Sequence, residues 1–242
     1  MCRLRIMPDS NSSPTTDKRL LLWDIDATLI TTGGAGDKAL KRAVEERFGV
    51  RDDLHDIEIA GRTDSGIAVQ ILRKYNVEPT TENVASFLAD YLRFLEEFLP
   101  LTSGRVLPGV AEILDRLHDN PDRVLALLTG NLRRGAELKL SHYGLWNYFE
   151  FGAFADDHHD RNELGAFARQ RAKEKHTEEF AVARIDVIGD TGHDIACGKI
   201  FGARTIAVAT GTWTRERLAE QSPDFLFDDL SRVDEVMAKL GW

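Results

Sequence analysis

The chain has 242 residues, 43% of them hydrophobic and 29% charged, which is typical of a globular protein with one large domain or two smaller ones. Its formal net charge of −9 argues against nonspecific binding to nucleic acid or to an anionic membrane, because both need clustered Lys and Arg. The two cysteines indicate no disulfide framework. With no secretory h-region and no apolar run of about 18 residues, no membrane span is expected, and the protein is predicted to be cytoplasmic.

Residues 1–17 are polar and are expected to form a flexible tail. Beyond them, short apolar runs predict buried strands. These runs lie at 19–25, 123–129, 148–154, 185–189 and 204–209, and a short last strand is expected at 224–229. Helical patterns fall between the strands, including 108–120 and 132–144. Strands that alternate with helices predict an α/β fold with a Rossmann-like, doubly wound parallel sheet.

One interval lacks this alternation. From about residue 32 to residue 104 no buried-strand run of comparable strength occurs, and helical patterns lie at 36–48, 64–75 and 81–99. We therefore expect an α-helical insertion at 33–104, within an α/β core made of 18–32 and 105–242.

Polar motifs follow four of the predicted strands. Ligands of open α/β sheets bind beyond the carboxyl ends of the strands, so these motifs mark the candidate site. In chain order they are "DIDAT", "TGN", "ADDHHDRNEL" and "GDTGHD". Together they place carboxylates, a hydroxyl, a cation and glycine-adjacent amides on one edge of the sheet.

This set of motifs resembles the haloacid dehalogenase superfamily, in particular its phosphoglycolate phosphatase-like and β-phosphoglucomutase-like members with a helical C1 cap. "DIDATL", "LLTGN" and "IGDTGHD" are similar to the family's first, second and fourth motifs, and "VLPGVAEILDRL" resembles the return from cap to core. The resemblance implies a Mg²⁺-dependent phosphatase that hydrolyses a small phosphate monoester, phosphoglycolate-like or a sugar phosphate, through an aspartyl-phosphate. It also implies a small phosphorylated metabolite as partner and a monomer or homodimer.

The resemblance implies roles for four aspartates. Asp24 is the expected nucleophile and a metal ligand, and a metal beside it would keep it ionised. Asp26 is expected to protonate the leaving group and then activate water, with only its backbone carbonyl on the metal. Asp190 is the expected principal carboxylate ligand, and Asp194 a second ligand or its support. Hard oxygen ligands suit Mg²⁺.

The second and third motifs would hold the phosphate. Thr129 and the amide of Gly130 are expected to bind the phosphoryl oxygens, and Asn131 to assist orientation. Arg161 stands where the family usually has Lys and would bridge nucleophile and phosphate, since a guanidinium donates bidentate bonds. Lys173 and Lys175, farther along the same helix, are the alternatives.

Two further positions bear on the site. Ala27 stands where the family usually has Gly, so a turn that needs positive φ would be strained there. Arg62 in "IAGRTDSGI" lies in a loop that resembles the GxTD loop of phosphoglycolate phosphatase-like members and would meet a second anionic group of the substrate. The alternative interpretation is that "TDSG" only starts a helix, with Thr63 or Asp64 as its cap.

Two rival functions stay open. A phosphomutase of the β-phosphoglucomutase type would use the same aspartyl-phosphate but return the phosphate to its substrate. A non-catalytic binding protein with this fold would lack metal-dependent hydrolysis of any phosphate ester. A dehalogenase would not need Asp26 or the metal site.

Overall fold

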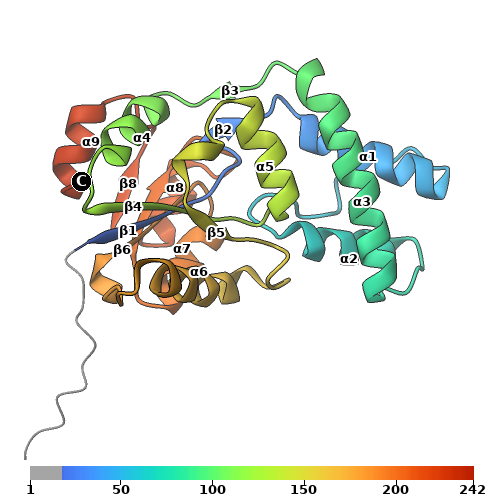
Figure 1. Cartoon of the computed structure of the whole chain (residues 1–242). Helices are drawn as coiled ribbons and strands as arrows, with labels where there is room; N and C mark the ends of the chain where they lie inside the picture. The colour runs from blue at the N-terminus through green and yellow to red at the C-terminus, as the bar shows by residue number, and fades with distance from the viewer. Residues whose placement is uncertain (1–17) are drawn as a thin grey trace, which may run out of the picture.

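The computed structural model describes residues 18–242, so the tail predicted for residues 1–17 lies outside the described residues. At its centre is a sheet of six parallel strands in the order β5-β4-β1-β6-β7-β8 (Figure 1). The strands are β1 Arg19–Trp23, β4 Arg123–Leu128, β5 Phe151–Ala153, β6 Ile185–Gly189, β7 Arg204–Val208 and β8 Phe225–Phe227. The predicted α/β fold with a doubly wound parallel sheet is confirmed.

The central strand β1 shows why these strands are apolar throughout. It pairs with β4 on one side and with β6 on the other, and Leu22 lies opposite both Ala126 and Val187. Leu21 and Trp23 face one hydrophobic core, whereas Leu20 and Leu22 face another. A strand covered on both faces has no solvent-facing positions, so its apolar residues do not alternate with polar ones.

Helices cover both faces of the sheet (Figure 1). On the face of Leu21 and Trp23 lie α4 Val110–His118, α5 Arg133–His142 and α9 Val233–Leu240. On the opposite face lie α6 Arg161–His176 and α7 Gly192–Ile200. The short helix α8 Arg215–Glu220 packs near the end of the sheet through Leu218. Single 3₁₀ turns span η1 Leu99–Leu101, η2 Trp146–Tyr148 and η3 Val182–Arg184.

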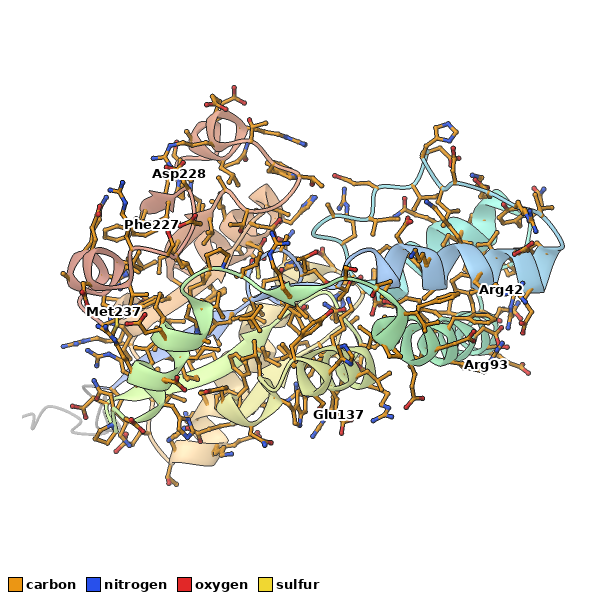
Figure 2. The ribbon with its side chains drawn as sticks, turned by 90° about the horizontal axis from the view of Figure 1, so that it is seen from above. Arg42, Arg93, Glu137, Phe227, Asp228 and Met237 are labelled. Atoms are coloured by element: carbon orange, nitrogen blue, oxygen red, sulfur yellow. The ribbon has the colours of Figure 1, made fainter. Side chains whose placement is uncertain are left out.

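Three further helices pack together beside the sheet (Figures 1 and 2). They are α1 Ala35–Phe48, α2 Asp64–Lys74 and α3 Thr81–Phe98, and they begin and end within a residue or so of the predicted helices. Their apolar faces share a separate hydrophobic core that includes Leu72, Phe87 and Leu95. Two short antiparallel strands, β2 Ile30–Thr31 and β3 Arg105–Val106, pair where the chain leaves the core and returns to it. Within residues 18–242, none of the helices has the length and apolarity needed to cross a membrane.

Several predicted elements extend beyond the observed ones, and two of these differences have a clear structural cause. The strand predicted at 148–154 spans only Phe151–Ala153, because the residues before it form the turn η2. The helix predicted from residue 108 begins at Val110, after Gly109 with φ of 80°. A Cβ at Gly109 would lie 1.8 Å from the Leu230 carbonyl oxygen, so the close approach of this chain segment requires glycine.

The edge of the sheet opposite the strand carboxyl ends holds a buried ion-pair cluster. Asp186 is 0% exposed and accepts hydrogen bonds from Arg19, from Arg204 and from the Trp242 indole. The Trp242 ring also lies 5.4 Å from the ring of Trp23. Trp242 therefore contacts both β1, through Trp23, and β6, through Asp186.

Candidate active site

The carboxyl ends of β1, β4 and β6 meet at one edge of the sheet and form the floor of a cavity. Asp24 follows β1, Thr129 follows β4 and Asp190 follows β6 directly. The cavity has a volume of about 480 Å³ and is also lined by residues of α1, α2 and α3, so it lies between the sheet and the three-helix group. Because parallel strands present their carboxyl ends together, the polar motifs converge as expected.

Three buried carboxylates cluster on this floor. One oxygen each of Asp24, Asp190 and Asp194 lies within 4.8 Å of the others, and the three residues are 5%, 4% and 2% exposed. Burial, together with the negative charges of Asp194 and Asp24, raises the pKa of Asp190 to about 9, against the opposing charge of Arg161. Burial also raises the pKa of Asp24 to about 6, against the opposing charge of Arg161. The structure therefore brings together the three aspartates whose side chains the sequence predicted as metal ligands.

Arg161 is the buried cation of this cluster. Its Nη2 lies 3.0 Å from Asp24 Oδ1 and donates to Asp194 Oδ1, while Nη1 donates to the Gly61 carbonyl at 3.2 Å. Burial opposes its charge, but the carboxylates of Asp194 and Asp24 outweigh burial and raise the pKa of Arg161. It is the first residue of α6, and Asp160 caps that helix by accepting from the Asn162 amide.

The two alternative cations lie elsewhere. Lys173 and Lys175 belong to the last turn of α6, where Lys173 pairs with Glu179 and Lys175 donates to the Glu150 carbonyl. Neither lines the cavity within the part of the chain that the structure describes. The geometry thus places Arg161, and not these lysines, beside the carboxylates.

Both carboxylate oxygens of Asp194 accept hydrogen bonds. It is the third residue of α7, and its Oδ2 accepts from the amide and the hydroxyl of Thr191 at 3.0 and 2.6 Å. Its Oδ1 accepts from Arg161. This capping box fixes the start of α7 and the position of Asp190, two residues before the helix.

The residues present fit a hard divalent cation. If all are ionised, three carboxylates and one guanidinium leave the cluster with a charge of −2, and the donor atoms are all oxygens. No hydrogen-bond donor of residues 18–242 contacts the Asp190 carboxylate, although it is almost fully buried. Such a carboxylate needs a cation or a proton as its partner.

A second network holds Asp26, whose side chain is about half exposed. Lys139 Nζ lies 2.6 Å from Asp26 Oδ2 and donates to Asn131 Oδ1 at 2.6 Å. Asn131 Nδ2 also donates to Asp26 Oδ2, at 2.9 Å, and to the hydroxyl of Thr129, at 2.9 Å. Burial opposes the charge of Lys139, but the negative charge of Asp26 and other neighbours outweighs it and raises the pKa of Lys139.

Lys139 is absent from the predicted site. It lies on α5, only 4% exposed, between Ala136 and Leu140 on the buried side of the helix. The signal in the sequence is this helical spacing, which places a lysine among apolar positions. A buried lysine needs a carboxylate partner, and here that partner is Asp26.

Ala27 adopts the left-handed conformation that its position suggested. Its φ is 58°, its amide donates to the Ile30 carbonyl at 2.7 Å, and its own carbonyl accepts from the hydroxyl of Thr210. A residue with a Cβ loses roughly 1 kcal/mol in this region relative to glycine. The turn after β1 is therefore strained at the residue next to Asp26.

The loop before α2 docks onto the sheet edge through its backbone and through Asp64. Gly130 is in close contact with it, since a Cβ there would lie 2.2 Å from the Arg62 carbonyl oxygen. The Asp64 amide donates to the Gly130 carbonyl at 2.7 Å, and its Oδ2 accepts from the Leu132 amide at 2.8 Å. The amide of Gly130 itself has no protein acceptor among residues 18–242, so it is available to a ligand.

Arg62 does not join the buried carboxylates. Its guanidinium pairs with Glu58 at the surface, with Nε 2.8 Å from Glu58 Oε2. Thr63 caps α2 by accepting from the Gly66 amide at 3.1 Å, as the alternative interpretation of this stretch proposed. Asp64 lines the cavity as a buried carboxylate, and burial raises its pKa to about 6 although Lys139 opposes this shift.

Comparisons with known proteins agree with this arrangement. The chain is 28% identical to the protein named "Probable phosphatase IndB" of Dickeya dadantii, over 89% of this chain and 92% of that one. It is 25% identical to the phosphoglycolate phosphatase of Vibrio parahaemolyticus, over 92% of this chain and 97% of that one. Among solved structures, a hydrolase from Pseudomonas syringae aligns with a TM-score of 0.72 at 17% identity, over 92% of this chain and 99% of that one. CbbY from Rhodobacter sphaeroides, in complex with phosphate, aligns with a TM-score of 0.71 at 16% identity, over 89% of this chain and 96% of that one.

A family model decides the classification. The model described as haloacid dehalogenase-like hydrolase matches residues 21–199, which include the last three residues of β1, the three-helix group and the motifs after β4 and β6. This match covers most of the chain and confirms the predicted membership of the superfamily. The chain belongs to the haloacid dehalogenase-like hydrolase family.

Proposed function

We propose that this hydrolase is a Mg²⁺-dependent phosphatase that hydrolyses a small phosphate monoester through an aspartyl-phosphate on Asp24. The observation that carries the proposal is the buried cluster of Asp24, Asp190 and Asp194, in which Arg161 is the one cation among residues 18–242. Its excess negative charge suits a divalent metal, and the relatives named as phosphatases support this reaction class.

The metal would be held by oxygens of three residues. These are the carboxylates of Asp24 and Asp190 and the backbone carbonyl of Asp26, with Asp194 as a further ligand or as support. When bound, Mg²⁺ supplies positive charge that offsets the charge of the phosphoryl group. Asp194 already accepts bonds from Thr191 and Arg161 through its two oxygens, which favours the supporting role.

In the first half of the proposed reaction, a carboxylate oxygen of Asp24 attacks phosphorus. The new O–P bond forms as the ester P–O bond breaks, and Asp26 gives its proton to the departing alkoxide. Arg161 bridges Asp24 and the phosphate, while the Thr129 hydroxyl and the Gly130 amide donate to phosphoryl oxygens. The nearly full burial of Thr129 and Arg161 makes these donors rigid before substrate binds.

In the second half, Asp26 acts as the base. It takes a proton from a water molecule, the water oxygen attacks phosphorus, and the bond to Asp24 breaks to release inorganic phosphate. Lys139 and Asn131 hold Asp26 Oδ2, so its other oxygen is left to face the reacting atoms. Holding one oxygen limits the rotation of the carboxylate between the two steps.

We further propose that residues 33–104 are a cap on a core of 18–32 and 105–242. The loop before α2 supports this, because its contacts with Gly130 and Leu132 place it directly beside the phosphate-binding segment. A cap in this position would exclude bulk water during the first step.

The proposal is tested by measuring phosphate release from a panel of esters, including p-nitrophenyl phosphate, with Mg²⁺ and with EDTA. We expect release with Mg²⁺ only, and a loss of about three orders of magnitude or more in Asp24→Asn. Asp122→Asn, an exposed carboxylate beyond the opposite end of the strands, is the matched control and should retain full activity. Equal rates in EDTA, or normal turnover by Asp24→Asn, would refute the proposal. Transfer of phosphate back to the organic substrate without release would instead indicate a mutase.

A further inference from the structure

The cavity extends beyond Asp26 into a space enclosed by the three-helix group. Gly36 of α1, Ile67 of α2 and Tyr91 of α3 line this part, together with Lys139. A Cβ built at Gly36 would lie 3.8 Å from the Tyr91 hydroxyl and 3.9 Å from Lys139 Nζ, so these groups surround one small space. In the proposed reaction, this space receives the alcohol that leaves from phosphorus.

Every cation that lines the cavity within residues 18–242 already has a carboxylate partner. Arg161 pairs with the carboxylates on the floor, and Arg62 pairs with Glu58 at the surface. Lys139 pairs with Asp26 and also donates to Asn131. A carboxylate on the leaving alcohol would have to compete with one of these ion pairs.

The charge that remains in this space is negative. Asp64 is 8% exposed, its Oδ2 accepts from the Leu132 amide, and no cation lies within ion-pair distance of it in the described part of the chain. A second carboxylate brought close to it would be repelled in an environment of low dielectric. The space is therefore unfavourable for an anionic leaving group.

The neutral groups in the same space favour hydroxyls. Tyr91 lines the cavity, and its hydroxyl makes no hydrogen bond within the part of the chain that the structure describes. Thr31 and Thr32 add hydroxyl groups to the lining, and Asp64 Oδ1 is a free acceptor. A phenol that faces a cavity without a protein partner favours a ligand that can hydrogen-bond to it.

We propose that the substrate is the phosphate monoester of an uncharged sugar or polyol, and not of a carboxylate-bearing alcohol such as glycolate. This inference rests on the proposed phosphatase function. The proposed substrate differs from the one in the name of the phosphoglycolate phosphatase of Vibrio parahaemolyticus, and the difference in binding between the two substrates can be measured.

The test compares kcat/KM for phosphoglycolate and for 2-hydroxyethyl phosphate, which differ only in a carboxylate against a hydroxymethyl group. We expect 2-hydroxyethyl phosphate to be preferred by about tenfold or more, and ribose 5-phosphate to be at least as good. Equal or higher kcat/KM for phosphoglycolate overturns the inference. Mg²⁺-dependent hydrolysis of p-nitrophenyl phosphate is measured in parallel, and its absence overturns the proposed phosphatase function and the inference with it.

Two conservative variants test the named groups. Asp64→Asn keeps an acceptor for the Leu132 amide and should shift the preference toward phosphoglycolate by about fivefold or more. Tyr91→Phe should lower kcat/KM for ribose 5-phosphate by about tenfold more than for p-nitrophenyl phosphate. Tyr148→Phe, whose hydroxyl pairs with Asp115 away from the cavity, is the control and should change neither ratio. Unchanged substrate ratios in both Asp64→Asn and Tyr91→Phe overturn the assignment.

Discussion

Replacing Asp64 by Asn should stabilise the protein at neutral pH. The buried carboxylate accepts one hydrogen bond, from the Leu132 amide, and Asn can accept the same bond through its Oδ1. What the variant removes is a negative charge that burial makes unfavourable. The pKa of Asp64 is raised from 3.8 to about 6, with burial as the main cause and the charge of Lys139 opposing it.

The magnitude follows from this shift. About two pKa units at about 1.4 kcal/mol each give a ceiling of about 3 kcal/mol for the cost of the ionised carboxylate. Asp64 is also the first residue of α2, where a negative charge favours the helix by about 0.3–1 kcal/mol. Burial is the larger effect, so we expect Asp64→Asn to raise the free energy of unfolding by about 1–2 kcal/mol at pH 7.5.

The pH dependence gives the sign of the effect. Because the folded pKa lies above the unfolded one, the penalty is complete above about pH 6–7 and absent below about pH 4, where both states are protonated. The gain from Asp64→Asn should therefore shrink as the pH falls through 6. Urea unfolding of both proteins in EDTA at pH 4.5 and pH 7.5 measures this difference.

Asp37→Asn is the matched control for this experiment. Asp37 also lies in the first turn of a helix of the three-helix group, but its side chain is largely exposed and pairs with Lys41. Its replacement should lower stability slightly or leave it unchanged. A loss of stability in Asp64→Asn at pH 7.5, or the same gain at both pH values, would refute the reasoning.

Three other substitutions have defined outcomes. Arg161→Gln should lower the free energy of unfolding by about 2–4 kcal/mol and abolish most phosphate release, because it leaves buried carboxylates without their cation. Lys175→Gln, on the same helix but away from the cavity, is the control and should change neither quantity. Ala27→Gly should raise the free energy of unfolding by about 0.5–1 kcal/mol, because φ of 58° strains a residue with a Cβ. Thermal unfolding measures this gain, and a lower unfolding midpoint in the variant would contradict this account. Asp186→Ala should lower the free energy of unfolding, measured with urea, by about 3 kcal/mol, because it breaks the ion-pair cluster at the far edge of the sheet. Phosphate release by the folded protein should stay intact. An unchanged free energy of unfolding would show that the cluster makes no net contribution to stability.

The sequence predicts well the parts that depend on local pattern. Continuous apolar runs such as Leu20–Trp23 mark strands buried on both faces, and they led to the α/β fold and its helical insertion. Strand ends were less well predicted, because the aromatic run before Phe151 packs in a 3₁₀ turn and is as apolar as a strand. Apolar residues report burial, and burial is common to strands and to packed turns.

For the site, the sequence by itself determined which residues follow the strands, and so it predicted that Asp24, Asp190 and Arg161 lie together at one edge of the sheet. Only the tertiary structure decided which groups line the rest of the cavity. Lys139 contacts Asp26 across 113 residues of chain, and Asp64 contacts Leu132 across 68. Both lie on helices, where a single charged residue has no local signature of its partner. The packing of α5 on the sheet brings Lys139 to Asp26, and the packing of the three-helix group against the sheet edge brings Asp64 to Leu132. Both packings are set by contacts distant in sequence.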